Sequence, residues 1–123
     1  MKKIIAVALL GATFSVLAKE VPVNSPELDL LFSNNTFHGV HYGKKTVQYF
    51  SDSGATWWMS SGDVKPSEGT WRIKNSQYCS NFGNEESCYD VVHDNSQDIY
   101  YFLKDEFRVP FIPREGYTFS TID

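Results

Sequence analysis

The chain has 123 residues, of which 41% are hydrophobic and 15% aromatic, and its formal net charge is −4. This length suits one domain, and the acidic balance argues against a nucleic acid or an anionic lipid surface as the partner. Two cysteines allow one disulfide bond within the chain.

Residues 1–18 have the pattern of a secretory signal peptide. A basic start of two lysines precedes the apolar run Ile4–Leu10, and a small-residue cleavage site ends at Ala18. The apolar run is shorter than the roughly 17–25 residues that a spanning helix needs, so we expect no membrane insertion. Cleavage would leave a single β domain, residues 19–123, with nine basic and 15 acidic residues and a net charge of −6. We expect it in the periplasm or secreted.

Ser25–Phe32 has the pattern of a short helix. Ser25 is expected as the N-cap and Pro26 in the first turn, with acidic residues near the positive end of the helix. The apolar residues of one side are Leu28, Leu31 and Phe32. A helix of two turns is not stable alone, so we expect this side to dock against the rest of the domain and plug one end of the sheet.

The next segments predict β-strands separated by turns. We expect strands at Thr36–Tyr42, Thr46–Phe50 and Ala55–Met59, the first two joined around Gly43-Lys44. A long polar connection then leads to Trp71.

The segment Gly69–Leu103 predicts an antiparallel meander. Polar pairs at Asn75-Ser76, Gly83-Asn84 and Asn95-Ser96 are expected as two-residue turns between aromatic and β-branched runs. The resulting registers agree on one apolar and one mostly polar face, as a sheet that covers a core requires. The apolar face holds Trp71, Ile73, Tyr78, Ser80, Phe82, Tyr89, Val91, Tyr100 and Phe102. Trp71 is expected to be buried against Tyr89 and Phe102.

The expected turn at Gly83-Asn84 places Cys79 directly opposite Cys88. Opposed residues of this kind have Cα atoms about 4.5–5.5 Å apart, which a disulfide can span. We therefore predict a Cys79–Cys88 disulfide on the outer face of the meander. Its closed loop of ten residues should stabilise the fold by about 2.5–3 kcal/mol on the chain-entropy model.

The end of the chain is less regular. Pro110 and Pro113 confine Phe107–Pro113 to an edge strand or a loop, and Tyr117–Ile122 is expected as a last strand. Taken together, the sequence predicts an all-β fold: an antiparallel meander of about eight strands with one short N-terminal helix, forming a small barrel or a sandwich. We favour the barrel, with a core filled by aromatic rings.

We expect no enzymatic activity, no cofactor and no metal site. His38 and His41 are three residues apart on a strand, so their side chains point to opposite faces and cannot share a metal ion. His93 is expected as a polar residue at a strand end. Glu85 and Glu86 are neighbours on a hairpin and do not face each other across a cleft, unlike the acids of a glycosidase. No serine lies in a nucleophile-elbow motif.

Two surfaces are predicted to bind a partner. The first is the hairpin tip formed by Asn84, Glu85 and Glu86. The second is the outer face of the last meander strand, which is apolar on both sides. This outer face consists of Val92, Ile99, Tyr101 and Leu103. Either the helix or the C-terminal segment covers it, or it binds another protein or a second copy of the chain as a homodimer.

The order of several motifs resembles a family of small exported bacterial β-proteins of uncharacterised function. These motifs are Leu31, Asn35-Thr36, Gly39, Tyr49-Phe50-Ser51-Asp52-Ser53-Gly54, Gly69-Thr70-Trp71, Cys79, Cys88-Tyr89 and Val91. The chain departs from the family pattern at Ser33 and Asn34, because a glycine precedes the Asn-Thr pair in the family. The resemblance implies the fold and the bridge but no active-site residue. In size, export and single bridge the chain is also similar in type to periplasmic lysozyme inhibitors and immunity proteins.

These features favour a non-enzymatic periplasmic protein that binds and inhibits another protein, with a peptidoglycan hydrolase as the expected target. The alternative is a lipocalin-like carrier of a small apolar ligand, and a third is a structural role in the cell envelope. An enclosed apolar cavity would favour the carrier, whereas a fully packed core would favour the inhibitor.

Overall fold

A computed structural model of the chain describes residues 19–119. The predicted signal peptide and the last residues of the predicted strand at Tyr117–Ile122 lie outside the described residues. The elements are β1 (Glu20–Pro22), α2 (Ser25–Phe32), β2 (Asn35–His41), β3 (Lys44–Phe50), β4 (Ala55–Ser60), β5 (Ser67–Lys74), β6 (Gln77–Asn81), β7 (Ser87–Asp94), β8 (Ile99–Lys104) and β9 (Phe107–Glu115).

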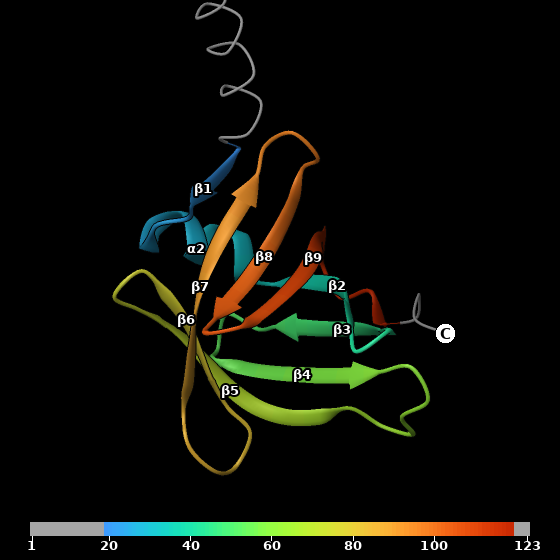
Figure 1. Cartoon of the computed structure of the whole chain (residues 1–123). Coiled ribbons are helices and arrows are strands. Elements are labelled where there is room, and N and C mark those ends of the chain that lie inside the picture. The colour runs from blue at the N-terminus through green and yellow to red at the C-terminus, as the bar shows by residue number, and fades with distance from the viewer. Residues whose placement is uncertain (1–18, 120–123) are drawn as a thin grey trace, which may run out of the picture.

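The strands β2 to β9 form a closed antiparallel barrel (Figure 1). Each strand pairs with the next in the sequence, and β9 returns to pair with β2. The short strand β1 adds to the barrel by pairing with the second half of β7, while the first half of β7 pairs with β6. The prediction of a small antiparallel β-fold with one short helix is therefore confirmed, and the fold is a barrel rather than a sandwich.

The helix α2 closes one end of the barrel (Figure 1). Its N-cap is Asn24 and not Ser25, so that expectation is wrong by one residue. The Asn24 side chain accepts a hydrogen bond from the backbone N–H of Glu27, and the Glu27 carboxylate accepts one from the N–H of Asn24. This reciprocal capping box satisfies two N–H groups that the first turn of a helix leaves unpaired. Leu28 and Phe32 are completely buried, so the expected docking is confirmed.

Phe32 lies at the centre of the core at this end. Its ring has aromatic neighbours on six strands, with centroids 4.5 to 6.5 Å away: Phe37, Phe50, Trp71, Tyr78, Phe102 and Phe111. Trp71 is buried, as predicted. Its ring neighbours, however, are Phe32 and Phe50, and its Nε1–H donates to the carbonyl oxygen of Ser51. The expected packing against Tyr89 and Phe102 is wrong, because α2 supplies the ring that covers Trp71.

Two-residue hairpin turns require residues with positive φ angles, and these angles show where the turns lie. Asn75 and Ser76 both have positive φ, 53° and 59°, as the turn that suits a twisted hairpin requires. A two-residue turn at this place pairs Ile73 with Tyr78, and this pairing is confirmed. The β2–β3 turn is Tyr42-Gly43, with φ of 53° and 77°, and not Gly43-Lys44.

The other two meander connections are longer than predicted. Four residues, 95–98, join β7 to β8, and five residues, 82–86, join β6 to β7. The predicted two-residue turn at Asn95-Ser96 would pair Val91 with Tyr100. Val91 instead pairs with Phe102, a slip of two residues. Because side chains alternate along a strand with a period of two, a slip of two keeps every side chain on its predicted face.

The strand β9 is an integral part of the barrel, so the expectation of an edge strand or loop is wrong. Its first half pairs with β8 and its second half with β2, and Phe111 has a partner on both sides. Pro110 has a partner only on β8, and Pro113 only on β2. At each proline, one side of β9 therefore has no strand partner. A proline fits such a position because it has no N–H group to donate to a neighbouring strand.

The segment after β9 does not continue as a strand in its described part. Tyr117, Thr118 and Phe119 have no strand pairing, and the backbone N–H of Thr118 instead donates to Oγ1 of Thr36, 3.0 Å away. Phe119 is buried. The described part of the expected last strand is thus a short strap across the outside of β2.

Candidate binding cavity

The end of the barrel opposite α2 contains a cavity of about 410 Å³. Its outer part is lined by residues at strand ends, among them His41, Ser67 and Phe107. Its inner part is lined by rings such as Phe37 and Phe102, which contact Phe32 of α2 from their other side. The helix therefore forms the closed end of the barrel, and the cavity opens between the loops at the other end.

Most of the cavity wall is aromatic. Six of the rings that line it come from five strands around the barrel: Phe37, Trp58, Tyr89, Phe102, Phe107 and Phe111. Several of them stack on one another, as Phe102 does on Phe111 with centroids 4.4 Å apart. Such a wall offers flat apolar surfaces whose positions are held by neighbouring rings.

A small polar network occupies the remaining wall. Gln48 is buried, and its Nε2 donates to Oγ1 of Thr56 and to the hydroxyl oxygen of Tyr78, both 3.0 Å away. Oγ1 of Thr56 in turn donates to the carbonyl oxygen of Tyr49, and the hydroxyl groups of Tyr78 and Ser80 are hydrogen-bonded. A buried polar group is stable only when it is bonded in this way.

Burial determines the state of the tyrosine in this network. The side chain of Tyr78 is 3% exposed, and burial raises its pKa well above the usual value, while the hydrogen bonds to Ser80 and Gln48 oppose the rise. The hydroxyl group therefore stays protonated at every physiological pH, and the cavity wall is neutral at this point.

The mouth of the cavity depends on a close approach at Gly69. A Cβ atom on this glycine would lie 2.7 Å from Cδ1 of Phe82 and 2.5 Å from the carbonyl oxygen of Asn81. No side chain fits there without moving the backbone. The missing side chain lets the Phe82 ring fold against β5 at the rim of the cavity, where Phe82 is also a lining residue.

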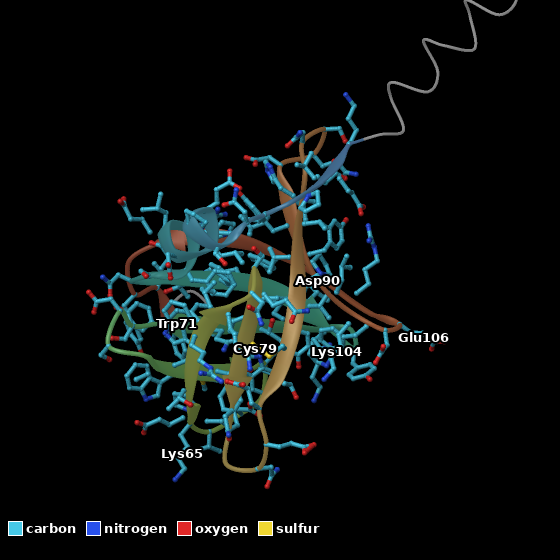
Figure 2. All side chains as sticks on the ribbon, turned by 90° about the vertical axis from the view of Figure 1, so that its left-hand side faces the viewer. Lys65, Trp71, Cys79, Asp90, Lys104 and Glu106 are labelled. Atoms are coloured by element: carbon cyan, nitrogen blue, oxygen red, sulfur yellow. A yellow bond between two sulfur atoms is a disulfide. The ribbon has the colours of Figure 1, made fainter. Side chains whose placement is uncertain are left out.

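The loops around the mouth expose large apolar side chains. Tyr42 is 91% exposed, Val64 97% and Phe82 43%, and they belong to three different connections at the open end of the barrel. Lys65 and Glu106, in two of the loops at this end, lie far from α2 in Figure 2. An apolar rim of this kind is a common feature of surfaces that contact another molecule.

The hairpin tip that the sequence predicts as a contact surface lies at this same end. Asn84 and Glu85 are exposed. Glu86 instead turns back along the barrel, where its carboxylate accepts two hydrogen bonds from Arg72, at 2.7 and 2.9 Å, and one from Lys74 at 3.2 Å. The Arg72 guanidinium, followed by Lys74, lowers the pKa of Glu86 to about 2. Glu86 is thus part of an ion-pair cluster on the outer face.

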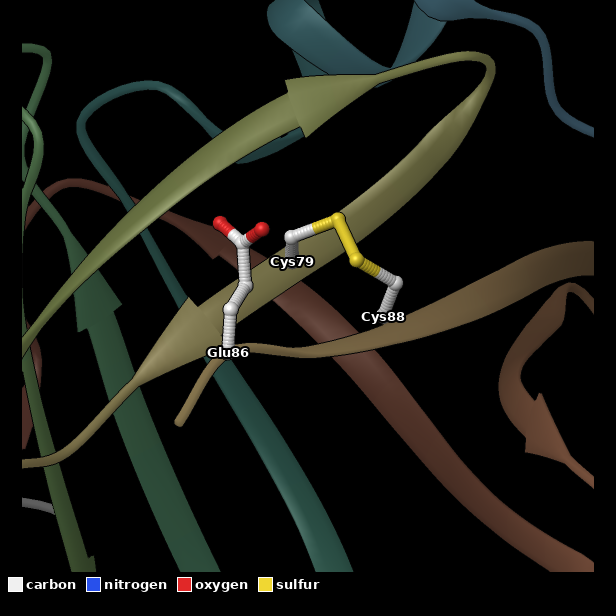
Figure 3. A group of neighbouring side chains, drawn as sticks. All are labelled: Cys79, Glu86 and Cys88. Atoms are coloured by element: carbon white, nitrogen blue, oxygen red, sulfur yellow. A yellow bond between two sulfur atoms is a disulfide. The ribbon is translucent and has the colours of Figure 1, made fainter. Parts of the chain in front are cut away.

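The predicted disulfide between Cys79 and Cys88 is present, and these residues are directly opposed as expected. Figure 3 shows the Glu86 side chain beside the bond, with a carboxylate oxygen within 4.8 Å of both sulfur atoms. Both sulfur atoms are oxidised and bonded to each other, so this cluster cannot supply the thiolates that a metal ion would need. An intramolecular disulfide of this kind indicates an oxidising, non-cytoplasmic compartment.

The second predicted contact surface lies on the outer face of β7 and β8. Its residues Val92, Ile99, Tyr101 and Leu103 are all half-buried. The guanidinium of Arg108 lies 4.0 Å from the centre of the Tyr101 ring and forms an ion pair with Glu20 of β1. Of the alternatives for this face, cover by α2 is wrong, because α2 closes the barrel end. The outer face of β7 and β8 and the hairpin tip do not line the cavity.

The three described histidines have separate surroundings. The imidazole Nε2 of His38 lies 2.7 Å from Oγ1 of Thr118 outside the barrel, whereas His41 lines the cavity, so these two point to opposite faces as predicted. Burial, with a further effect of Arg114, lowers the pKa of His38. The imidazole of His93 pairs with Asp98 at the end of β7.

Within residues 19–119, no helix is long and apolar enough to cross a membrane. Comparisons with protein-family models, with curated proteins and with solved structures found no match. The fold and the site define a class only: a small disulfide-bonded β-barrel, closed by a helix at one end and open to an aromatic cavity at the other.

The apolar face of the meander was predicted correctly from the sequence, but the cavity was not. The available signal was the set of small or polar residues that alternate onto the inner face, namely Thr46, Gln48 and Ser80. Polar residues at inward positions are unusual in a packed core, and here they mark the part of the barrel that side chains do not fill.

Proposed function

We propose that the chain is an extracytoplasmic binding protein that takes up a small, largely apolar molecule through the open end of its barrel. The observation that carries this proposal is the aromatic cavity of about 410 Å³. Ligand pockets usually measure about 300–1,000 Å³ and combine an apolar wall with a few placed polar groups, and this cavity has both properties. A packed interior would instead have favoured the inhibitor.

The architecture supports reversible binding in a preformed site. The Phe32 side of α2 seals the inner end, and the disulfide holds β6 against β7, so little ordering is needed when a ligand enters. A two-ring molecule about the size of a tryptophan side chain would bury about 200 Å². At about 25 cal/mol per Å² this contributes about 5 kcal/mol before the cost of association. We therefore expect dissociation constants of roughly 0.2 mM or weaker.

The test uses purified, oxidised protein from residue 19 onward and the uncharged fluorescent probe N-phenyl-1-naphthylamine. We expect saturable binding with a rise in probe fluorescence. Val109→Trp should abolish binding, because Val109 lines the cavity and the larger ring would fill it. Ile112→Trp is the matched control on the same strand, since Ile112 is 38% exposed and does not line the cavity. Equal binding by both variants, or no saturable binding by the unmodified protein, would contradict the proposal.

A second candidate is the inhibitor or immunity protein that the sequence favours, acting on a peptidoglycan hydrolase in the periplasm. The observation in its favour is the apolar rim, where Tyr42 and Val64 project almost completely into solvent at the same end of the barrel as the loop that carries Asn84 and Glu85. Aromatic and apolar side chains at a rim can anchor a protein contact, and the rim loops would then block the catalytic cleft of the hydrolase.

The second candidate is tested by titrating a peptidoglycan hydrolase encoded beside this chain with the purified protein. We expect stoichiometric inhibition that Tyr42→Ser with Val64→Ser removes, while Val109→Trp leaves it intact because that residue lies inside the barrel. A hydrolase that stays fully active in excess of the protein would rule this candidate out. Inhibition without probe binding would make it the preferred function.

A further inference from the structure

The cavity has two chemically different walls. Its buried polar side chains come from β3 and β6, which lie in one half of the barrel circumference: Thr46, Gln48, Tyr78 and Ser80. The other half, from β7 through β9 to β2, supplies mainly rings and aliphatic groups, and its polar members are the hydroxyl group of the half-buried Tyr89 and His41 at the rim. A ligand in this cavity therefore has one apolar face and one edge that meets hydrogen-bonding groups.

No lysine, arginine, aspartate or glutamate lines the cavity in the part of the chain that the structure describes. A ligand carboxylate or phosphate group would lose its hydration on entry without gaining an ion pair, at a cost that small binding energies cannot offset. The wall chemistry therefore disfavours fatty acids and other anions. It favours an uncharged ligand.

One group of the polar wall can only accept hydrogen bonds. Both hydrogens of the Gln48 amide nitrogen are used by Thr56 and Tyr78. The group that Gln48 can still offer to a bound molecule is its carbonyl oxygen Oε1, which only accepts hydrogen bonds. A ligand that carries an O–H or N–H group at its polar edge can use this acceptor as well as the hydroxyl groups of the wall, whereas an ether or a ketone can use the hydroxyl groups alone.

We infer that the ligand is an uncharged, planar aromatic molecule with a hydrogen-bond donor on one edge, such as a phenol or an indole, held with its ring against Phe102 and its donor towards Gln48. This inference rests on the proposed function and specifies its ligand class. The Phe102 ring is half-buried and stacks on Phe111 at an interplanar angle of 26°, which fixes its position on the apolar side. Gln48 provides the acceptor on the polar side.

Three molecules with the same two rings separate these requirements in a calorimetric titration of the purified protein. 2-Naphthol has the donor, 2-methoxynaphthalene replaces it with an ether, and 2-naphthoate is charged. One satisfied hydrogen bond corresponds to about three- to tenfold in affinity, so 2-naphthol should bind about that much more tightly than the ether. The anion should bind about 100-fold more weakly than 2-naphthol, or not measurably.

Gln48→Met removes the acceptor and keeps a side chain of similar length. We expect this variant to bind 2-naphthol no more tightly than 2-methoxynaphthalene, with the affinity for the ether unchanged. Ser80→Ala keeps both hydrogen bonds of Gln48 and is the second variant, because Gln48→Met removes two buried hydrogen bonds and could prevent folding. Its expected result is an unchanged preference for 2-naphthol, since the Gln48 acceptor remains.

The outcomes separate this inference from the function on which it rests. If N-phenyl-1-naphthylamine binds but the ether binds as tightly as 2-naphthol, or if 2-naphthoate binds best, the donor rule is wrong and the binding function stands. If neither the probe nor any of the three molecules binds, the proposed function itself fails. A preference for 2-naphthol that survives Gln48→Met, or one that is lost in Ser80→Ala, would also overturn the assignment of Gln48.

Discussion

At the scale of single residues, Glu86 shows how position changes the role of a side chain. Its neighbour Glu85 is exposed at the loop, whereas Glu86 folds back to Arg72 and Lys74 and lies beside the disulfide (Figure 3). The two guanidinium hydrogen bonds form a planar, two-point contact, which is stronger than a single contact between the same charges. Glu86 thus ties the β6–β7 loop to β5.

This ion pair should make stability depend on pH in the acidic range. The pKa of Glu86 falls from 4.5 to about 2 in the folded protein, so its stabilising effect is complete above pH 4.5 and is lost as the pH falls towards 2. We expect Glu86→Gln to lower the free energy of unfolding at pH 7, with a difference from the unmodified protein that shrinks between pH 4.5 and pH 2. Urea denaturation at a series of pH values measures it.

The matched control is Glu85→Gln, one residue away. Glu85 forms no ion pair within the described residues 19–119, so its substitution should leave the pH dependence of stability close to that of the unmodified protein. A Glu86→Gln curve that runs parallel to the unmodified one from pH 7 to pH 2 would show that the Arg72 contact does not persist in solution.

At the scale of elements, α2 has little stability of its own and owes its place to the rings that surround it. Its two buried residues, Leu28 and Phe32, enter the end of the barrel, and Phe32 separates the packed half of the interior from the cavity. The helix therefore closes one end of the barrel and supports the inner wall of the cavity. Its removal should affect stability and ligand binding together.

Phe32→Ala should lower the free energy of unfolding by about 3–5 kcal/mol, the range for deleting a large buried aromatic side chain. The control is Leu30→Ala on the same helix, which should have little effect because Leu30 is 82% exposed. Urea denaturation monitored by circular dichroism gives both values. Near-native stability of Phe32→Ala would mean that α2 does not plug the barrel.

Local features of these elements could be predicted from the sequence. The turn at Asn75-Ser76 determines the β5–β6 register, and the apolar alternation determines the faces even where a loop is longer than expected. The pairing of Cys79 with Cys88 follows from these rules, because it depends on residues close in sequence. Such contacts are determined by turn geometry and side-chain alternation.

Features that depend on barrel closure could not be predicted in the same way. The pairing of β9 with β2 joins segments about 70 residues apart, and nothing near Pro110 or Pro113 indicates that each would have one free side. The return of Glu86 to Arg72 depends on how the 82–86 loop bends, and the cavity depends on how eight strands enclose space. These are properties of the whole arrangement.

At the scale of the whole molecule, the two ends of the barrel differ, because α2 lies across one end and loops surround the other (Figure 1). Rings from α2 and the surrounding strands fill the first, and the second keeps a cavity with an aromatic wall and a polar wall. The disulfide and the Glu86 ion pairs brace the outer side of the strands that carry the polar wall. A rigid, preformed site is what the proposed function requires.

The outer surface offers a competing place for an aromatic ligand. A groove of about 880 Å³ runs over the outside of β3 and β4 and is lined by Tyr49, Trp57, Lys65, Pro66, Glu68 and Tyr117. It is larger than the cavity but carries charged side chains and lies on the outer face of the barrel. A measurement of binding alone does not separate these two sites, so the location of the ligand is the decisive observation.

The most direct test is a two-dimensional ¹H–¹⁵N NMR titration of the oxidised protein with 2-naphthol. We predict that the backbone amide signals of Gln48, Phe102, Phe107 and Phe111 shift together and saturate, while those of Trp57, Lys65 and Tyr117 stay in place. Shifts confined to the outer groove or to the rim loops, or no saturable shift at all, would contradict the central claim that the barrel interior is the binding site.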